Sequence, residues 1–286
     1  MKNIRANLSH ALLFASIFLA CLTTASEALY WEQLKGDHFV INYTNDRKFA
    51  QEVLAKAELS YGRIADFFGF SRYSDFWTWN RRVEIFIYPN QTAYLEGTGH
   101  WEWSDGKADY ANRQISMYAG NPKFIESIVP HEIAHLVFRD FIGFETNIPL
   151  WLDEGVATLV EKGTYANIKE NIKKYYDNSA LLTLKDMTTL DFKKCSTQPT
   201  FHSIRMKNKQ RGVLSLTPAN FITIYYVQAT SVVGFLKERY GIQRFVEFCQ
   251  YLRDGKALDD ALRKAFGEEC RDLETLENKW REYISQ

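Results

Sequence analysis

Two short motifs constrain this chain more than any other feature: HEIAH at 131–135 and WLDEG at 151–155. Histidines at positions i and i+4 share one face of an α-helix, with Cβ atoms roughly 5–6 Å apart. Two imidazoles so placed can bind one metal ion at about 2.0–2.1 Å. Glu132 lies about 100° further round that helix, which suits a general base better than a ligand. Glu154 offers a third ligand, and two imidazoles with one carboxylate leave a coordination position open, as in catalytic zinc sites.

The residues around the first motif favour a long, firmly packed helix. An apolar stripe runs through it, formed by Ile125, Ile128, Val129, Ile133, Leu136 and Val137. Asn121 and Pro122 make a good N-cap and first-turn pair, so the helix is predicted to begin there. Pro130 falls inside it, and we expect a kink just before His131. An ordinary amphipathic helix with two polar residues on its exposed face would not account for Glu154 on the next helix.

The two motifs together resemble those of the gluzincin zinc metallopeptidases, in particular the peptidase MA-like domain. The resemblance extends from about His38 to about Gly241. Its flanking elements occur in the family's order: strand 38–43, a long helix, strand 83–88, the turn Trp103-x-x-Gly106-x-Ala108, strand 114–118, the metal helix, and a later Tyr226-x-Gln228-Ala229-x-Ser231 run. The resemblance implies hydrolysis of peptide bonds in a peptide or protein substrate.

Site residues follow from the same resemblance. It implies one Zn²⁺ per chain, with His131, His135 and Glu154 as ligands and Glu132 as the general base. It also implies an oxyanion donor, for which Tyr226 is the residue that aligns.

Other residues could take part in the same site. Tyr225 and His202 are the alternatives for the oxyanion donor. Thr158 lies four residues beyond Glu154, on the same helix face, and could orient a ligand from behind. Some gluzincins carry an aspartate at that position.

The predicted fold is α+β of the zincin type, a small, mostly antiparallel sheet with helices on one face and a helical C-terminal subdomain. The sheet and metal helix occupy 29–162, and 163–286 forms the C-terminal part. Phe49, Val53, Ala57 and Ile64 predict a helix from Asp46 to Phe68, ended by Gly69. Gln114–Tyr118 is expected to be the sheet edge beside the cleft. Residues 181–218 are expected to be an irregular insertion or cleft-side flap.

The N-terminus has the composition of a secretory signal peptide. Lys2 and Arg5 precede a run of 12 largely apolar residues, 11–22, which is shorter than the roughly 20 that span a bilayer. Small residues then permit cleavage after residue 25 or 28. The mature chain is predicted to be periplasmic or secreted, without a membrane span. Lipidation of Cys21 is the alternative.

Net charge is +0, so no overall field favours nucleic acid or an anionic membrane. The basic run between Arg205 and Arg211 is interpreted as a solvated loop, with a nucleic-acid patch as the alternative. Removal of the signal peptide leaves Cys195, Cys249 and Cys270. Either Cys249 and Cys270 form a disulfide, or all three are buried thiols.

Two other functional classes remain open from the sequence. One is a catalytically silent zinc-binding envelope or scaffold protein, which would not need Glu132. The other is a non-peptidase hydrolase or envelope-assembly factor that uses the same site. The sequence has no acidic motif for anchoring a substrate amino group, which favours an endopeptidase over an aminopeptidase.

Overall fold

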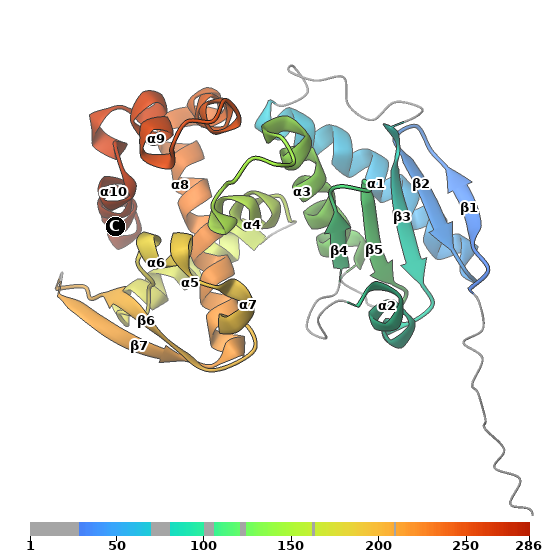
Figure 1. Ribbon diagram of the computed structural model, residues 1–286, viewed down its shortest axis with the longest axis horizontal. Coiled ribbons are helices and arrows are strands. Elements are labelled where there is room, and N and C mark those ends of the chain that lie inside the picture. The colour runs from blue at the N-terminus through green and yellow to red at the C-terminus, as the bar shows by residue number, and fades with distance from the viewer. Residues whose placement is uncertain (1–28, 70–80, 100–105, 121–123, 162–163, 209) are drawn as a thin grey trace, which may run out of the picture. The chain divides into compact units, whose positions relative to one another are not determined.

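The computed structural model describes residues 29–286 except 70–80, 100–105, 121–123, 162–163 and 209 (Figure 1). Met1–Tyr30 and Trp31–Gln286 are separate units, and the fold below is that of the second. The predicted signal peptide and the predicted helix start at Asn121 and Pro122 lie outside the described residues.

A five-stranded sheet forms the N-terminal half, with strand order β1-β2-β3-β5-β4. Its strands are β1 (Glu32–Lys35), β2 (Phe39–Tyr43), β3 (Val83–Tyr88), β4 (Gly106–Asp109) and β5 (Gln114–Tyr118). The β2–β3 and β3–β5 pairs are parallel, and the two outer pairs are antiparallel. The prediction of a mostly antiparallel sheet was therefore wrong. The helix between β2 and β3 is the crossover that a parallel pair requires.

The predicted edge strand was also wrong, because β4 and not β5 lies at the end of the sheet. β5 pairs with β3 on one side and β4 on the other, for example Ile115 with both Ile85 and Ala108. β4 has only four residues, Gly-Lys-Ala-Asp, and no apolar alternation. Nothing in its sequence distinguished it from a turn.

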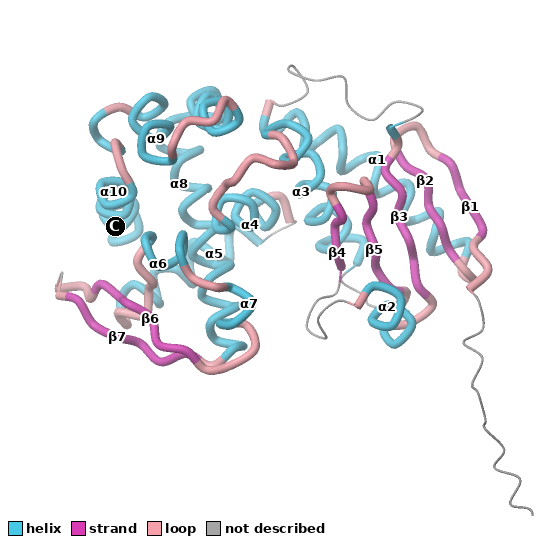
Figure 2. Tube along the Cα trace, in the orientation of Figure 1, coloured by secondary structure: helices cyan, strands magenta, loops and turns pink. Residues whose placement is uncertain are grey.

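Helices cover one face of this sheet (Figures 1 and 2). α1 (Arg47–Phe68) packs on β2 and on α3 (Val129–Ile142). Its predicted limits are confirmed, since the Asp46 side chain accepts from the Phe49 amide at 2.9 Å and Gly69 ends the helix with φ 66°. The short α2 (Gln91–Thr98) contacts β3 and β5.

A π-helical turn, η3 (Phe124–Ile128), leads directly into α3. Pro130 lies in the first turn of α3, where a missing N–H interrupts no hydrogen bond of the helix. The backbone changes from π-helical to α-helical just before His131, at the place where the sequence predicts a kink.

The C-terminal half is mainly helical, and the described residues of 181–218 form regular elements. Its elements are α4 (Leu150–Leu159), α5 (Thr164–Asp177), α6 (Leu184–Thr189), α7 (Phe192–Cys195), β6 (Thr200–Arg205), β7 (Arg211–Leu216), α8 (Pro218–Arg253), α9 (Leu258–Phe266), the 3-10 turn η4 (Glu268–Cys270) and α10 (Leu273–Ser285). The irregular loop predicted for 181–218 was wrong, because it contains α6, α7 and the antiparallel hairpin β6–β7. Elements of four to six residues are too short for a periodic sequence signal.

α8 is long and apolar enough to cross a membrane by length and composition alone. Of its most apolar window, 67% is buried inside the protein. Its apolar residues thus form the core of the C-terminal half. The helix is interrupted at Gly241, whose φ of 82° is not helical.

Cys195, Cys249 and Cys270 are buried free thiols in this structure. Cys249 and Cys270 do not form a disulfide here, so the structure agrees with the alternative of three buried thiols.

Gly155 allows α4 and α8 to pack in close contact. A Cβ at this position would lie 2.6 Å from the Ala229 carbonyl oxygen and 2.6 Å from a methyl carbon of Val233. The first of these is backbone and cannot rotate away. The glycine beside Glu154 therefore sets how closely α8 approaches the helix that carries this residue.

We expect Gly155→Ala to lower the free energy of unfolding by about 1–3 kcal/mol, because it overpacks the α4–α8 contact. Gly62, inside α1, is the matched control, since a Cβ there meets nothing within 4 Å. Gly62→Ala should instead stabilise the protein by about 0.5–1 kcal/mol. Urea denaturation of both variants measures the difference. Wild-type stability of Gly155→Ala would contradict this account of the contact.

Candidate metal centre

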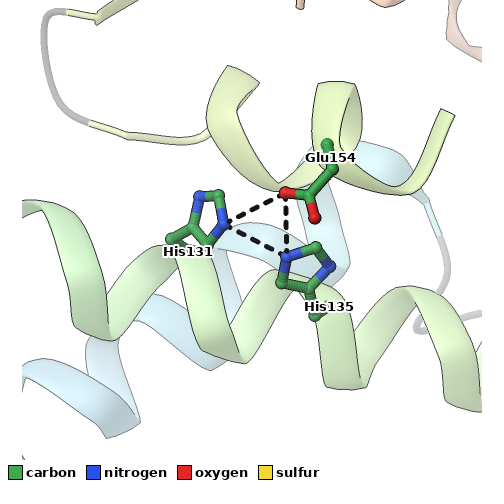
Figure 3. Close-up of side chains that lie close together, drawn as sticks. All are labelled: His131, His135 and Glu154. Carbon is green, nitrogen blue, oxygen red and sulfur yellow. Dashed lines mark hydrogen bonds and ion pairs between the residues drawn. The ribbon is translucent and has the colours of Figure 1, made fainter. Parts of the chain in front are cut away.

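α3 places His131 and His135 one turn apart on the same side, with their Nε2 atoms 3.1 Å apart (Figure 3). The rest of the helix is anchored in the core, where Ile133, Val137 and Phe138 are fully buried. Core packing therefore fixes the helix, and the helix fixes the separation of the two imidazoles.

α4 brings Glu154 to the same point from the facing helix (Figure 3). Its Oε2 atom lies 3.6 Å from Nε2 of His131 and 3.5 Å from Nε2 of His135. The structure thus brings together the three residues that the sequence predicted as ligands, and their donor atoms converge.

The geometry of these three atoms fits a metal ion. A triangle with sides of 3.1, 3.5 and 3.6 Å has a circumscribed radius of about 2.0 Å, close to the length of zinc–imidazole bonds. The Glu154 Oε2 atom is buried without a hydrogen-bond partner among the described residues. A carboxylate oxygen is rarely left so, because its desolvation is uncompensated unless a cation lies beside it. The group could therefore hold a metal ion.

Each histidine is oriented from behind by a carboxylate. Nδ1 of His135 lies 2.9 Å from Asp153, and Nδ1 of His131 lies 2.9 Å from Glu161. The Arg139 guanidinium donates to the second oxygen of Asp153 at 2.9 Å from Nε and 2.7 Å from Nη2. A carboxylate on Nδ1 fixes the ring orientation and leaves the Nε2 lone pair for a metal ion.

Thr158, which the sequence suggested for this supporting role, does not fill it. Its hydroxyl is buried without a hydrogen-bond partner among the described residues. The supporting carboxylates were missed, although the sequence held weak signals for both. Asp153 immediately precedes Glu154, and Glu161 follows it by seven residues, which is about two helical turns.

Glu132 is 7% exposed and lies beneath β4. Burial raises the pKa of its carboxyl group, and His131, His135 and the backbone N–H of Ala108 partly offset that rise. A Cβ at Gly106 would lie 2.7 Å from Cγ2 of Ile128 and 3.0 Å from Oε1 of Glu132, so β4 passes close to both side chains.

Tyr226, on α8, is beside the three residues. Its ring centroid lies 6.4 Å from that of His131. Burial and then the Glu154 carboxylate raise the pKa of its hydroxyl well above the usual value, because both oppose a phenolate there.

The two alternatives to Tyr226 point elsewhere. Tyr225 donates its hydroxyl to the Met187 carbonyl at 3.2 Å. His202 lies 2.7 Å from the Thr200 hydroxyl and stacks on Phe221, with centroids 5.2 Å apart.

Tyr110 is a second tyrosine at the site, and the sequence carried no motif for it. It follows β4, and its ring lies 6.2 Å from that of His135 and 5.4 Å from the Arg139 guanidinium carbon. Burial, with Asp153 and Glu154 nearby, raises the pKa of its hydroxyl to about 12.

Without a metal ion the site compensates its carboxylates with protons. Burial by itself lowers the pKa of His131, but Glu154 and Glu161 outweigh it and raise the pKa to about 9. The pKa of His135 is raised in the same way, with burial opposed by Tyr110 and Asp153. Burial would raise the pKa of Glu154, yet the imidazoles hold it well below its usual range. A metal ion must therefore displace protons from the histidines.

We expect the apparent metal affinity to increase from about pH 6 to about pH 9, because a histidine pKa of about 9 makes protons compete below that value. Metal binding at neutral pH should also release protons. Calorimetric titration with zinc, in buffers of different ionisation enthalpy, measures both. The control is His131→Ala/His135→Ala, which should show neither effect. A wild-type affinity that does not change with pH would contradict this.

Comparison with known proteins adds no assignment, since no family model matches the chain and no curated protein sequence is similar to it at a significant level.

Proposed function

We propose that this protein is a zinc-dependent metallopeptidase of the gluzincin type that hydrolyses peptide bonds. One observation carries the proposal: the donor atoms of His131, His135 and Glu154 converge, and Glu132 is buried beside them. A binding site alone would not need that fourth side chain. Its presence favours a reaction over simple metal storage.

Zinc is the metal that suits this donor set. Two neutral imidazoles and one carboxylate are the ligands of several catalytic zinc sites, and such sites keep a position open. Hard cations such as Mg²⁺ and Ca²⁺ prefer oxygen ligands alone. When bound, zinc would supply Lewis-acid chemistry, polarising a carbonyl and lowering the pKa of a water molecule.

Glu132 would handle the proton in this reaction. Its carboxylate would accept a proton from the attacking water and return it to the leaving amine. Burial raises its pKa above the ordinary range, which moves a carboxyl group closer to exchanging protons at neutral pH. The backbone N–H of Ala108 favours the ionised form of this carboxylate and partly offsets the rise in its pKa.

The substrate would bind along β4. This strand is an edge of the sheet, and an extended peptide can add to such an edge through backbone hydrogen bonds. Backbone pairing ignores side chains, and so suits internal positions of a protein chain. We therefore propose endopeptidase action, with a peptide or protein as the substrate.

Tyr226 would stabilise the oxyanion of the tetrahedral intermediate. Its raised pKa keeps the hydroxyl protonated, as a hydrogen-bond donor must be. The proposal also places the reaction outside the cytoplasm, in the periplasm or the medium, on the composition of residues 1–28.

The first test is Glu132→Gln. This variant should fold and bind one zinc ion like the wild type, while turnover of a peptide library falls by about 10²-fold or more. Removing zinc with a chelator should abolish wild-type activity, and added zinc should restore it. Metal analysis and digestion assays provide the measurements.

Three outcomes separate the alternatives. Zinc binding without cleavage of any peptide by the wild type would favour a silent binding or scaffold protein. Cleavage of a non-peptide ester or amide alone would favour a different hydrolase. Unchanged peptidase activity in Glu132→Gln would mean that the chemistry occurs elsewhere.

A second test separates Tyr226 from its neighbour. Tyr226→Phe should lower kcat and kcat/KM about equally, because it removes a hydrogen bond made mainly in the transition state. Tyr225→Phe is the control, since its hydroxyl donates to Met187 and not toward the site. It should leave kcat unchanged at a small loss of stability. A kinetic defect found only in Tyr225→Phe would show that the oxyanion donor was misassigned.

A further inference from the structure

Glu161 uses both of its carboxylate oxygens at the site. Oε1 lies 2.9 Å from Nδ1 of His131, and Oε2 accepts a hydrogen bond of 2.7 Å from the Ser127 hydroxyl. The side chains of Glu161 and His131 are each 16% exposed, so water competes little for these contacts. One carboxylate thus joins a proposed metal ligand to a second, uncharged donor.

Three elements meet at this carboxylate. Ser127 belongs to the π-helical turn η3, four residues before His131, and Glu161 follows the end of α4. The end of α4 is itself held from α1, where Arg63 donates to the Val160 carbonyl at 3.2 Å. π-helical turns within helices are often found at functional sites. Here the turn delivers a hydroxyl to the carboxylate behind a ligand.

His135 is supported differently. Its carboxylate partner, Asp153, is 2% exposed and is neutralised by Arg139 on α3, the helix that carries His135. Glu161, the partner of His131, accepts a hydrogen bond from Ser127 on a separate turn. The orientation of His131 therefore depends in part on how η3 packs against the end of α4.

We infer that Glu161 and Ser127 form a positioning pair for His131, and that the pair sets the strength of metal binding at the proposed site. Glu161 accepts a hydrogen bond from Nδ1–H of His131, which leaves the Nε2 lone pair free for the metal ion. Ser127 holds the second oxygen and so restricts rotation of the carboxylate. The inference rests on the proposed metal site, but it does not require peptide hydrolysis.

The experiment measures the zinc dissociation constant by chelator competition for five variants and the wild type at one pH. Glu161→Ala should weaken binding about 10–100-fold, the usual effect of losing such a partner. Glu161→Gln should weaken it less, because the carboxamide oxygen still accepts from Nδ1. Ser127→Ala should have a smaller effect than Glu161→Ala, and none when added to Glu161→Ala, since its hydroxyl acts through that carboxylate.

Thr158→Val is the matched control, because it changes a buried side chain of α4 whose hydroxyl makes no hydrogen bond with a described residue. It should leave zinc affinity unchanged. The absorption spectrum of the Co²⁺-substituted protein is a second readout, which a loss of stability alone would not alter. We expect it to change in Glu161→Ala and to stay like the wild type in Thr158→Val.

Wild-type zinc affinity and cobalt spectrum in Glu161→Ala would overturn the inference and leave the proposed function standing. So would an effect of Ser127→Ala that is undiminished in the Glu161→Ala background. Equal losses in Glu161→Ala and Glu161→Gln, accompanied by a matching loss of stability in the metal-free protein, would assign Glu161 a structural role only. Failure of the wild type to bind zinc would overturn both proposals.

Discussion

The structure depends on the burial of several carboxylates close together around His131 and His135. The carboxylates of Glu132, Asp153, Glu154 and Glu161 are largely buried around the two imidazoles, and Arg139 forms an ion pair with Asp153. Carboxylates so close together are costly to desolvate unless cations compensate them. Protons on the histidines, or a metal ion between them, provide that compensation. The site is therefore suited to exchange protons on the histidines for a metal ion.

The surrounding fold fixes where those charges can lie. α1 and α3 pack on the sheet and on each other, and α4 packs between α3 and α8. The sheet contains parallel pairs because its central strands are connected through helices. The short β4 forms one edge of the sheet, next to the buried carboxylate of Glu132. A Cβ added at Gly106 would crowd Ile128 and Glu132, and one added at Gly155 would clash with the backbone of α8.

The segment 181–218 connects this site to the C-terminal helices. Phe192, on α7, packs against Tyr225 and Tyr226, with ring centroids 5.1 and 6.3 Å away. The same segment also contacts α10 through the buried ion pair of Arg281 and Glu277. Arg281 donates to the Arg205 carbonyl, and Glu277 accepts from the Leu184 amide. These contacts attach the described part of the segment to the C-terminal helices, and they place Phe192 against the ring of Tyr226.

The sequence was enough to identify the candidate metal-binding residues and the helix that carries two of them. Their geometry is local, because a spacing of four residues on an α-helix places two side chains together in any fold. It also determined α1, since capping and periodicity act within the helix. The parallel strand pairs, the edge strand β4 and the hairpin β6–β7 needed the tertiary structure. The carboxylates behind the histidines did too, because Asp153 and Glu161 reach them across 18 and 30 residues of chain, and no local rule specifies such contacts.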